Sequence, residues 1–350
     1  MRVKSNNLIS QIASTRMQGA AYDWLRGLRI DAHPNNPFWS LSLYWPTIRA
    51  QCRLDLQAGE YRFSPLTQLK GADGDWVTCW EPLDLIVQKA MAMVLTPWLD
   101  RKMNLAAATH LPGHGGLKKA VVTTQGYARN NDFVLKTDIA DYYASMQHHV
   151  LHNQLCQHIA DKKVQGLLWQ VMDRVHVCAG VHKQIKTKSI ARGCPLSPLF
   201  AAVYLQPVDA LIKKYQLDYV RYMDDFVIMT HSRYQLKRIL KRLYTLLASL
   251  GLKLATAKTW LGRVRKGIAF LGYEISPSDL SLSARSFDRM CDRFRRLYEQ
   301  GAPVARLTKY VNNWIKWARS GVSLDIEKLK LKTTKILQTT FHMRVPLHSS

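Results

Sequence analysis

The sequence predicts an α+β fold, because short strand-like segments stand among longer segments with helical periodicity. Phe133–Leu135 is typical of a strand, and residues 234–250 are typical of an amphipathic helix. Hydrophobic residues make up 47% of the 350-residue chain, enough for a substantial core, which excludes a disordered basic tail. The 50 lysines and arginines outnumber the 25 aspartates and glutamates, so the formal charge is +25. A folded protein with this surplus is expected to bind a polyanion.

The polyanion is expected to be a nucleic acid, because the sequence offers little to a membrane. The most apolar segment, residues 90–99, is too short to span a bilayer and contains Pro97. The N-terminus lacks the apolar region of a secretory signal. The six cysteines are scattered without a Cys-x-x-Cys pair, which predicts reduced thiols and a cytoplasmic protein.

Local sequence signals predict the remaining elements in chain order. Runs rich in β-branched and aromatic residues predict a strand at 133–135, a hairpin over 217–230, and a strand or tight hairpin over 268–275. Helical periodicity predicts helices over 88–95, 148–174, 199–211 and 234–250, and helix throughout from Ser281 onward, including 304–319. Gly251 is expected to end one helix, and Ser323 to cap another.

The C-terminal third of the chain carries most of the positive surplus. Between residues 231 and 275, Glu274 is the only acid among many lysines and arginines. In the helix expected next, apolar residues recur at three- and four-residue spacing. Four arginines occupy a neighbouring face of this helix: Arg285, Arg289, Arg293 and Arg296. This face is predicted to be basic and exposed.

The few acids are placed where strands are expected to end. Asp224 and Asp225 lie at the tip of one predicted hairpin, and Asp138 ends a separate strand. Carboxylates from two neighbouring strand ends would repel each other unless cations lay between them. Two Mg²⁺ ions about 4 Å apart would activate an attacking 3′-hydroxyl and stabilise a leaving pyrophosphate. Taken alone, the Asp-Asp pair is equally well explained as an ordinary turn dipeptide.

Five motifs in sequential order resemble those of reverse transcriptases of the bacterial, group II intron-like branch. The motifs are Asp138–Tyr143, Gly193–Pro198, Tyr222–Asp225, residues 251–254 with Lys258, and Phe270–Tyr273. The resemblance covers roughly residues 36–300 and implies a right-hand polymerase with fingers, a palm containing an antiparallel sheet, and a helical thumb. The implied domains are an N-terminal helical extension (1–35), fingers (36–120), a palm (121–275) with a fingers insertion around 147–190, and the thumb (276–350).

The resemblance also implies the roles of individual residues. Asp138 and Asp224 would bind two Mg²⁺ ions, with Asp225 as a supporting carboxylate. Tyr143 would exclude a ribose 2′-hydroxyl, and the less favoured alternative is a core tyrosine. The nucleotide-binding residues implied are Ile139, Tyr143, Arg192, Gly193 and Lys258. The nucleic-acid-binding residues implied are Tyr222, Met223, Leu271, Gly272, Arg285, Arg289, Arg293 and Arg296.

Some positions depart from the family pattern or leave two interpretations open. Arg192 stands where the family usually has glutamine, which adds a charge beside the nucleotide. Lys258 would reach the leaving pyrophosphate or be a solvated lysine. The usual fingers arginine has no counterpart, and its candidate substitutes are Lys70, Lys118, Lys119 and Arg192. The Gly-rich segment 110–119 lacks a Walker sequence and is expected to be a backbone loop near template or nucleotide.

A cluster of histidines and one cysteine on a predicted helix has a weaker signal. Its members are His148, His149, His152, Cys156 and His158. His148 and His152 have the spacing of a metal pair, but no second Cys/His pair accompanies them, so an ordinary helix face is favoured.

The function implied is RNA-directed DNA polymerisation, with dNTPs, a DNA primer or product, and an RNA template, expected to be a structured non-coding RNA. Because no nuclease module is recognised after the thumb, a stand-alone enzyme is expected. Its resemblance to compact defence-associated lineages implies a role in antiphage defence. Two alternatives remain: a catalytically silent RNA-binding scaffold, and an enzyme of the diversity-generating or intron type.

Overall fold

A computed structural model describes residues 7–70, 76–178, 181–184, 187–324, 327, 331 and 333–335. Contacts between residues divide the chain into two compact units. The first unit comprises Met1–Ala107, Ile139–Lys214 and Arg242–Leu254, and the second comprises Ala108–Asp138, Tyr215–Lys241 and Ala255–Ser350. Helix α12 (Arg233–Ser249) contributes to both units.

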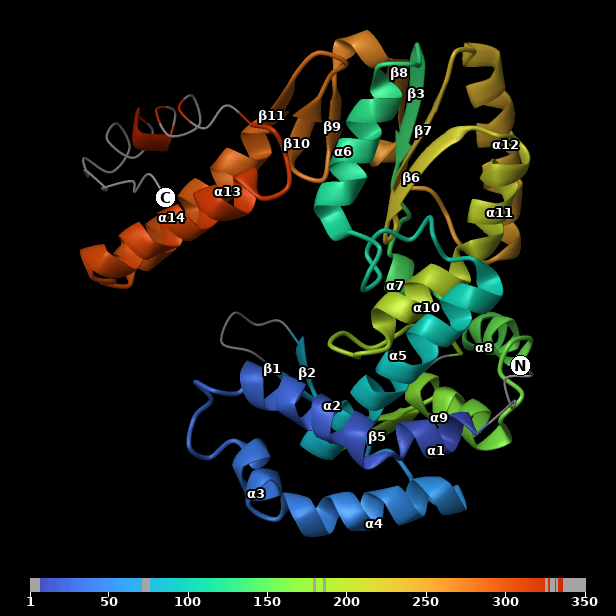
Figure 1. Cartoon of the computed structure of the whole chain (residues 1–350), viewed down its shortest axis with the longest axis vertical. Coiled ribbons are helices and arrows are strands. Elements are labelled where there is room, and N and C mark those ends of the chain that lie inside the picture. The colour runs from blue at the N-terminus through green and yellow to red at the C-terminus, as the bar shows by residue number, and fades with distance from the viewer. Residues whose placement is uncertain are drawn as a thin grey trace. The chain divides into compact units, whose positions relative to one another are not determined.

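The first unit is a helical body with one small sheet (Figure 1). Its helices are α1 (Leu8–Ile12), α2 (Thr15–Leu28), α3 (Pro37–Leu43), α4 (Trp45–Ala58), α5 (Pro82–Met103), α7 (Tyr142–Ser145), α8 (His148–Cys156), α9 (Lys162–Met172), α10 (Ser197–Tyr204) and α11 (Gln206–Lys214). The sheet has the order β2-β1-β4-β5, with β1 (Leu66–Lys70), β2 (Trp76–Cys79), β4 (Val175–Cys178) and β5 (Val181–Gln184). Helix α5 contacts α1, α2, α3 and α10, which explains its largely apolar sequence.

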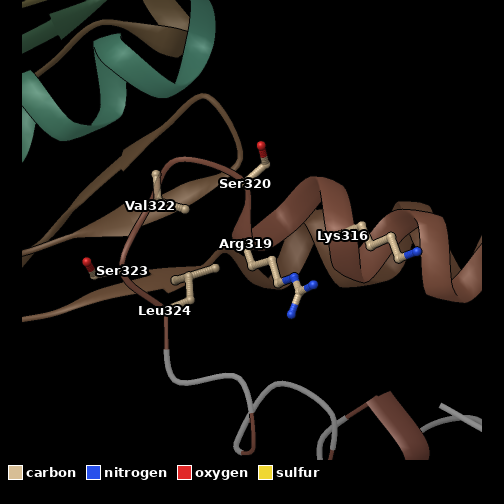
Figure 2. A pocket seen from close by; sticks show the side chains of 6 residues that line it. All are labelled: Lys316, Arg319, Ser320, Val322, Ser323 and Leu324. Carbon is tan, nitrogen blue, oxygen red and sulfur yellow. The ribbon is translucent and has the colours of Figure 1, made fainter. Parts of the chain in front are cut away.

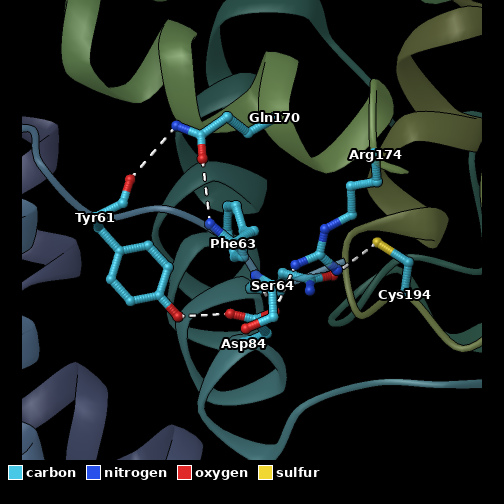
Figure 3. A network of polar contacts seen from close by, with 8 residues as sticks. Tyr61, Phe63, Ser64, Asp84, Gln170, Arg174 and Cys194 are labelled. Atoms are coloured by element: carbon cyan, nitrogen blue, oxygen red, sulfur yellow. Dashed lines mark hydrogen bonds and ion pairs between the residues drawn. The ribbon is translucent and has the colours of Figure 1, made fainter. Parts of the chain in front are cut away.

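A buried ion pair joins α5 to the segment between α9 and β4 (Figure 3). Arg174 Nη2 lies 2.5 Å from Asp84 Oδ2, and both side chains are 3% exposed. The Tyr61 hydroxyl donates to Asp84 Oδ1 at 2.7 Å, and the Ser64 amide donates to Oδ2 at 3.0 Å. The guanidinium carbon also lies 4.7 Å from the centroid of the Phe63 ring. Burial raises the pKa of Asp84, and the Arg174 cation opposes that rise.

The second unit contains two antiparallel sheets and the C-terminal helices. The larger sheet has the order β6-β7-β3-β8, with β3 (Phe133–Thr137), β6 (Asp218–Tyr222), β7 (Asp225–Thr230) and β8 (Trp260–Arg263). The smaller sheet, β11-β10-β9, consists of β9 (Ile268–Phe270), β10 (Tyr273–Ile275) and β11 (Leu280–Leu282). The helices are α6 (Gly116–Ala128), α13 (Ala284–Glu299) and α14 (Val304–Arg319), with 3₁₀ turns η1 (Thr256–Lys258) and η2 (Val264–Lys266). One hydrophobic core joins α6, both sheets, α13 and α14.

Helix α14 lies beside α13 (Figure 1). Lys118 connects α6 to the C-terminal end of α14. Its ammonium contacts the Tyr273 hydroxyl and the Trp317 carbonyl, and donates to the Ala318 carbonyl at 3.1 Å. It also lies 4.9 Å and 4.5 Å from the ring centroids of Tyr273 and Trp317. Burial lowers the pKa of Lys118 to about 8, whereas these carbonyls and ring faces stabilise the cation.

The α+β prediction is confirmed, and so is the antiparallel hairpin predicted over 217–230. Helix α12 begins and ends within one residue of the predicted bounds. Within the described ranges, no helix is long and apolar enough to cross a membrane. Cys52, Cys79, Cys156, Cys194 and Cys291 are free thiols, as predicted.

Three predicted helices differ from the structure. The helix expected over 148–174 is two helices, because Asp161 caps a new start at α9 by accepting from the amides of Lys163 and Val164. The helix expected over 199–211 is divided into α10 and α11 at Leu205. Ser281 and Leu282 are not helical, since they pair with β10. The helix expected after Ser323 lies largely outside the described residues.

Replacing Arg174 by methionine is expected to lower the free energy of unfolding by about 3 kcal/mol, because Asp84 would stay buried without its cation. Urea denaturation followed by circular dichroism measures the change. Arg26→Met is the control, since Arg26 and Asp23 form an exposed pair, and its effect should stay below about 1 kcal/mol. Equal effects of the two variants would contradict a structural role for the buried pair.

Replacing Lys118 by methionine is expected to lower the melting temperature by about 2–4 °C, because two carbonyls at the end of α14 lose their cation. The neighbouring variant Lys119→Met should leave it unchanged, since Lys119 is exposed. A melting temperature of Lys118→Met at or above that of the wild type would mean that burial of the charge outweighs these contacts.

Candidate active site

Three aspartates meet at one end of the larger sheet of the second unit. Strands β3 and β7 are antiparallel, and their last pair is Thr137 with Phe226. Continuing this register by one residue sets Asp138 opposite Asp225. Strands β6 and β7 pair up to Tyr222 and Asp225, so Asp224 lies in the tight turn between them. The predicted convergence of the acids follows from this strand order.

The carboxyl groups are close enough to perturb one another. The Asp138 carboxyl is 6% exposed and forms a hydrogen bond with that of Asp224. Burial, and then the Asp138 charge, raise the pKa of Asp224 to about 7. The same two causes raise the pKa of Asp225, against the charges of Lys136 and Lys258. The neighbouring lysines therefore do not fully offset the effect of burial and of the Asp138 charge on the other two carboxyl groups.

Two lysines flank this cluster. The Lys258 ammonium contacts Asp138 Oδ2, and its pKa is raised by that hydrogen bond and by the carboxylate charge. Lys258 is the last residue of η1, and the Asp138 carbonyl anchors the start of η1 by accepting from the Ala255 amide at 2.8 Å. Lys136 was not predicted, although it precedes Asp138 by two residues on a strand, where alternation sets both side chains on one face.

The donor set of this cluster fits a divalent cation of the magnesium type. Its ligands would be carboxylate oxygens, which Mg²⁺ prefers, and a cation between Asp138 and Asp224 would relieve their repulsion. In the described part of the chain, no group of three or more His, Cys, Asp or Glu side chains has metal-site geometry. Mg²⁺ commonly needs only one or two carboxylates, since water and substrate phosphates complete its shell.

Tyr222 and Met223 precede the acids in the turn. Tyr222 is half-buried, and its ring lies edge-on to His110 with centroids 6.0 Å apart. Met223 has a φ of 55°, in the left-handed backbone region that residues other than glycine rarely adopt. The Met223 amide donates to His110 Nδ1 at 3.1 Å. Nothing in the sequence signals this contact from the Gly-rich segment.

The predicted nucleotide-binding residues other than Lys258 belong to the first unit. Ile139 is buried and forms a β-bridge with Leu254. Tyr143 is half-buried, and its ring is tilted against that of Tyr142 at 5.5 Å. The Tyr143 carbonyl accepts from the Ile190 amide at 2.9 Å, so the backbone here is fixed.

The loop that carries Arg192 and Gly193 is held from α5 and from Trp80. The Trp80 indole donates to the Arg192 carbonyl at 2.8 Å, and its ring lies 4.8 Å from the Arg174 guanidinium. Gly193 has a φ of 81°, and a Cβ there would lie 3.3 Å from Trp80 Nε1, so glycine is required. Cys194 donates to Gln88 Oε1 at 3.1 Å (Figure 3 shows Cys194). Trp80 was not predicted.

Leu271 and Gly272 form the turn between β9 and β10. Both have positive φ, 49° and 89°. The Gly272 carbonyl accepts from the Ser283 amide at 3.0 Å and from the Ser286 hydroxyl at 2.7 Å. These bonds tie the turn to the start of α13.

The four arginines of α13, Arg285, Arg289, Arg293 and Arg296, are all exposed. The apolar face of α13 is buried in the core at Phe287, Met290, Phe294 and Leu297. At the end of α14, a surface cavity of about 620 Å³ is lined by Lys316, Arg319, Ser320, Val322, Ser323 and Leu324 (Figure 2). Its charged lining residues are both basic.

The histidine cluster on α8 uses its rings for backbone contacts. His148 Nε2 lies 2.7 Å from the Ser189 carbonyl, and His152 Nε2 lies 3.1 Å from the Gln165 carbonyl. These contacts favour the interpretation as a structural helix face.

Comparison with known proteins returned matches of three kinds. Residues 77–275 match the family described as reverse transcriptase (RNA-dependent DNA polymerase). Protein YkfC of Escherichia coli (strain K12) is 23% identical over 232 residues, which cover 55% of this chain and 60% of YkfC. The putative COX1/OXI3 intron 1 protein of Saccharomyces cerevisiae (strain ATCC 204508 / S288c) is 21% identical over 341 residues, 79% of this chain and 40% of that protein. The chain thus spans less than two thirds of these relatives.

Among solved structures, a chain of the "Partial Cas6-RT-Cas1--Cas2 complex" aligns with a TM-score of 0.44 and 19% identity. The alignment covers 70% of this chain and 43% of that one.

Proposed function

The chain belongs to the reverse transcriptase family, and from that membership and its aspartate cluster we propose that it is an RNA-directed DNA polymerase. The family catalyses nucleotidyl transfer and generally uses divalent metal ions. The supporting observation is the hydrogen-bonded, charge-crowded pair Asp138 and Asp224 at one sheet end. Repelling carboxylates are costly for stability, so their retention favours a catalytic purpose.

Asp138 and Asp224 are the proposed ligands of two Mg²⁺ ions, and Asp225 supports them. When bound, the ions would lower the pKa of a 3′-hydroxyl and neutralise the leaving pyrophosphate. The carboxylates would hold the reacting groups in place, and Asp138 among them is buried. Lys258 contacts Asp138. We propose that its ammonium neutralises the negative charge of the departing pyrophosphate or gives it a proton.

Selection of the nucleotide is proposed to depend on Ile139, Tyr143, Arg192 and Gly193. Tyr143 follows Asp138 by five residues, where the family places its sugar gate. Its fixed backbone suits that role, because a ring excludes a 2′-hydroxyl only when it cannot move away. The Trp80 contact likewise limits motion of the Arg192–Gly193 backbone.

The template and primer are proposed to contact Tyr222, Met223, Leu271, Gly272, Arg285, Arg289, Arg293 and Arg296. The exposed arginines of α13 support this, since phosphates of a duplex bind such a face without sequence preference. The finer proposals rest on the motifs alone: the group II intron-like branch, a structured non-coding RNA as template, a cytoplasmic location and a role in antiphage defence. Similarity to a yeast intron protein over most of this chain keeps an intron-type enzyme as the second candidate.

Changing Asp224 and Asp225 together to asparagine is expected to reduce dNTP incorporation on a primed RNA template at least about a thousandfold, because charge stabilisation of the transition state is lost. Primer extension measures the rate, and a filter-binding assay should show unchanged RNA affinity. Asp132→Asn is the control, because Asp132 is an exposed acid of the same unit. Incorporation by the double variant at the wild-type rate would refute the assignment, and RNA binding by an inactive wild type would favour the scaffold alternative.

Changing Tyr143 to alanine is expected to raise NTP use relative to dNTP use about tenfold or more, because the 2′-hydroxyl would no longer meet the ring. Single-nucleotide incorporation with each substrate measures the ratio of kcat/KM values. Tyr143→Phe keeps the ring and should keep the wild-type ratio. If alanine and phenylalanine behave alike, Tyr143 is an ordinary packed tyrosine.

A further inference from the structure

The turn that carries Asp224 has a conformation that its own sequence does not favour. It is a two-residue turn between β6 and β7, and Met223 occupies its first position with a φ of 55°. Glycine is preferred at such positions, because a Cβ in the left-handed region costs roughly 1–2 kcal/mol. Neighbouring groups must therefore hold Met223 in place.

Those groups come from residues 108–110, at the start of the Gly-rich segment. Ala108 forms a parallel bridge with Arg221. Thr109 donates twice to the Arg221 carbonyl, from its amide at 3.1 Å and from its hydroxyl at 2.7 Å. The segment is thereby fixed beside β6, just before the turn.

His110 then contacts the turn itself. Its Nδ1 accepts from the Met223 amide at 3.1 Å, and the fully buried Arg221 donates from Nη1 to the Met223 carbonyl at 3.1 Å. Both backbone polar groups of Met223 are therefore bonded to side chains. For Nδ1 to accept this bond, the ring proton must lie on Nε2.

We propose that His110 is a positioning residue for Asp224, which presupposes that Asp224 serves the polymerase reaction proposed above. It holds the left-handed turn so that the Asp224 carboxyl faces Asp138. Without this acceptor the turn can relax, and the two carboxyl groups lose their mutual geometry. A displacement of about 1 Å at a reacting centre reduces rates strongly.

The test compares His110→Leu with His110→Asn. Leucine removes the acceptor, whereas the asparagine Oδ1 can accept near the place of Nδ1. On a primed RNA template, His110→Leu should lower kcat about tenfold or more with the KM for dNTP changed less than about threefold. His110→Asn should restore kcat to within about threefold of the wild type.

A second readout does not depend on activity. Binding of Mn²⁺ alone, followed by the electron paramagnetic resonance signal of the free ion, should weaken about threefold or more in His110→Leu and recover in His110→Asn. His149→Leu, at an exposed histidine of α8, is the control and should match the wild type in both assays. His110→Ala replaces the leucine variant if leucine prevents folding.

Wild-type kcat in His110→Leu, or equal loss in the leucine and asparagine variants with unchanged Mn²⁺ binding, would overturn the proposal. If the wild type incorporates no dNTP, the proposed function fails, and the Mn²⁺ titration alone still decides whether His110 positions the carboxylates.

Discussion

The crowding of the Asp138 and Asp224 carboxyl groups is the main electrostatic constraint at this end of the larger sheet of the second unit. The two residues end different strands of one antiparallel sheet, and burial together with mutual charge raises the pKa of Asp224 to about 7. Contacts from neighbouring segments surround this end of the sheet. Lys258, the η1 turn and the contacts of residues 108–110 with β6 all serve to hold it.

In the first unit, a buried charge has a different role. The ion pair of Asp84 and Arg174 has a structural role. The Arg174 guanidinium lies against two aromatic rings, those of Phe63 and Trp80. Trp80 then anchors the carbonyl of Arg192. The pair therefore connects the core around α5 to the loop proposed to face the nucleotide, and breaking it would disturb both.

Much of the fold could be predicted locally, and the errors have local causes as well. The hairpin of β6 and β7 and helix α12 follow from periodicity and turn residues. The break before α9 depends on the capping bonds of Asp161. The apolar residues recur at helical spacing on both sides of the break, so the periodicity alone does not show it. Leu282 lies two residues before α13 but pairs with Tyr273, and such cross-strand pairing overrides local propensity.

The sequence by itself indicated the family and the proposed chemistry of this protein, through ordered motifs, three aspartates among few acids, and a basic helix whose apolar face predicts its packing. Only the tertiary structure decided which side chains support that chemistry. Lys118 was a candidate for triphosphate binding, yet its ammonium lies on carbonyls at the end of α14. His110 and Trp80 act on residues more than a hundred positions away. Contacts of this kind leave no periodic trace, because they depend on where strands and loops meet in space rather than on neighbours along the chain.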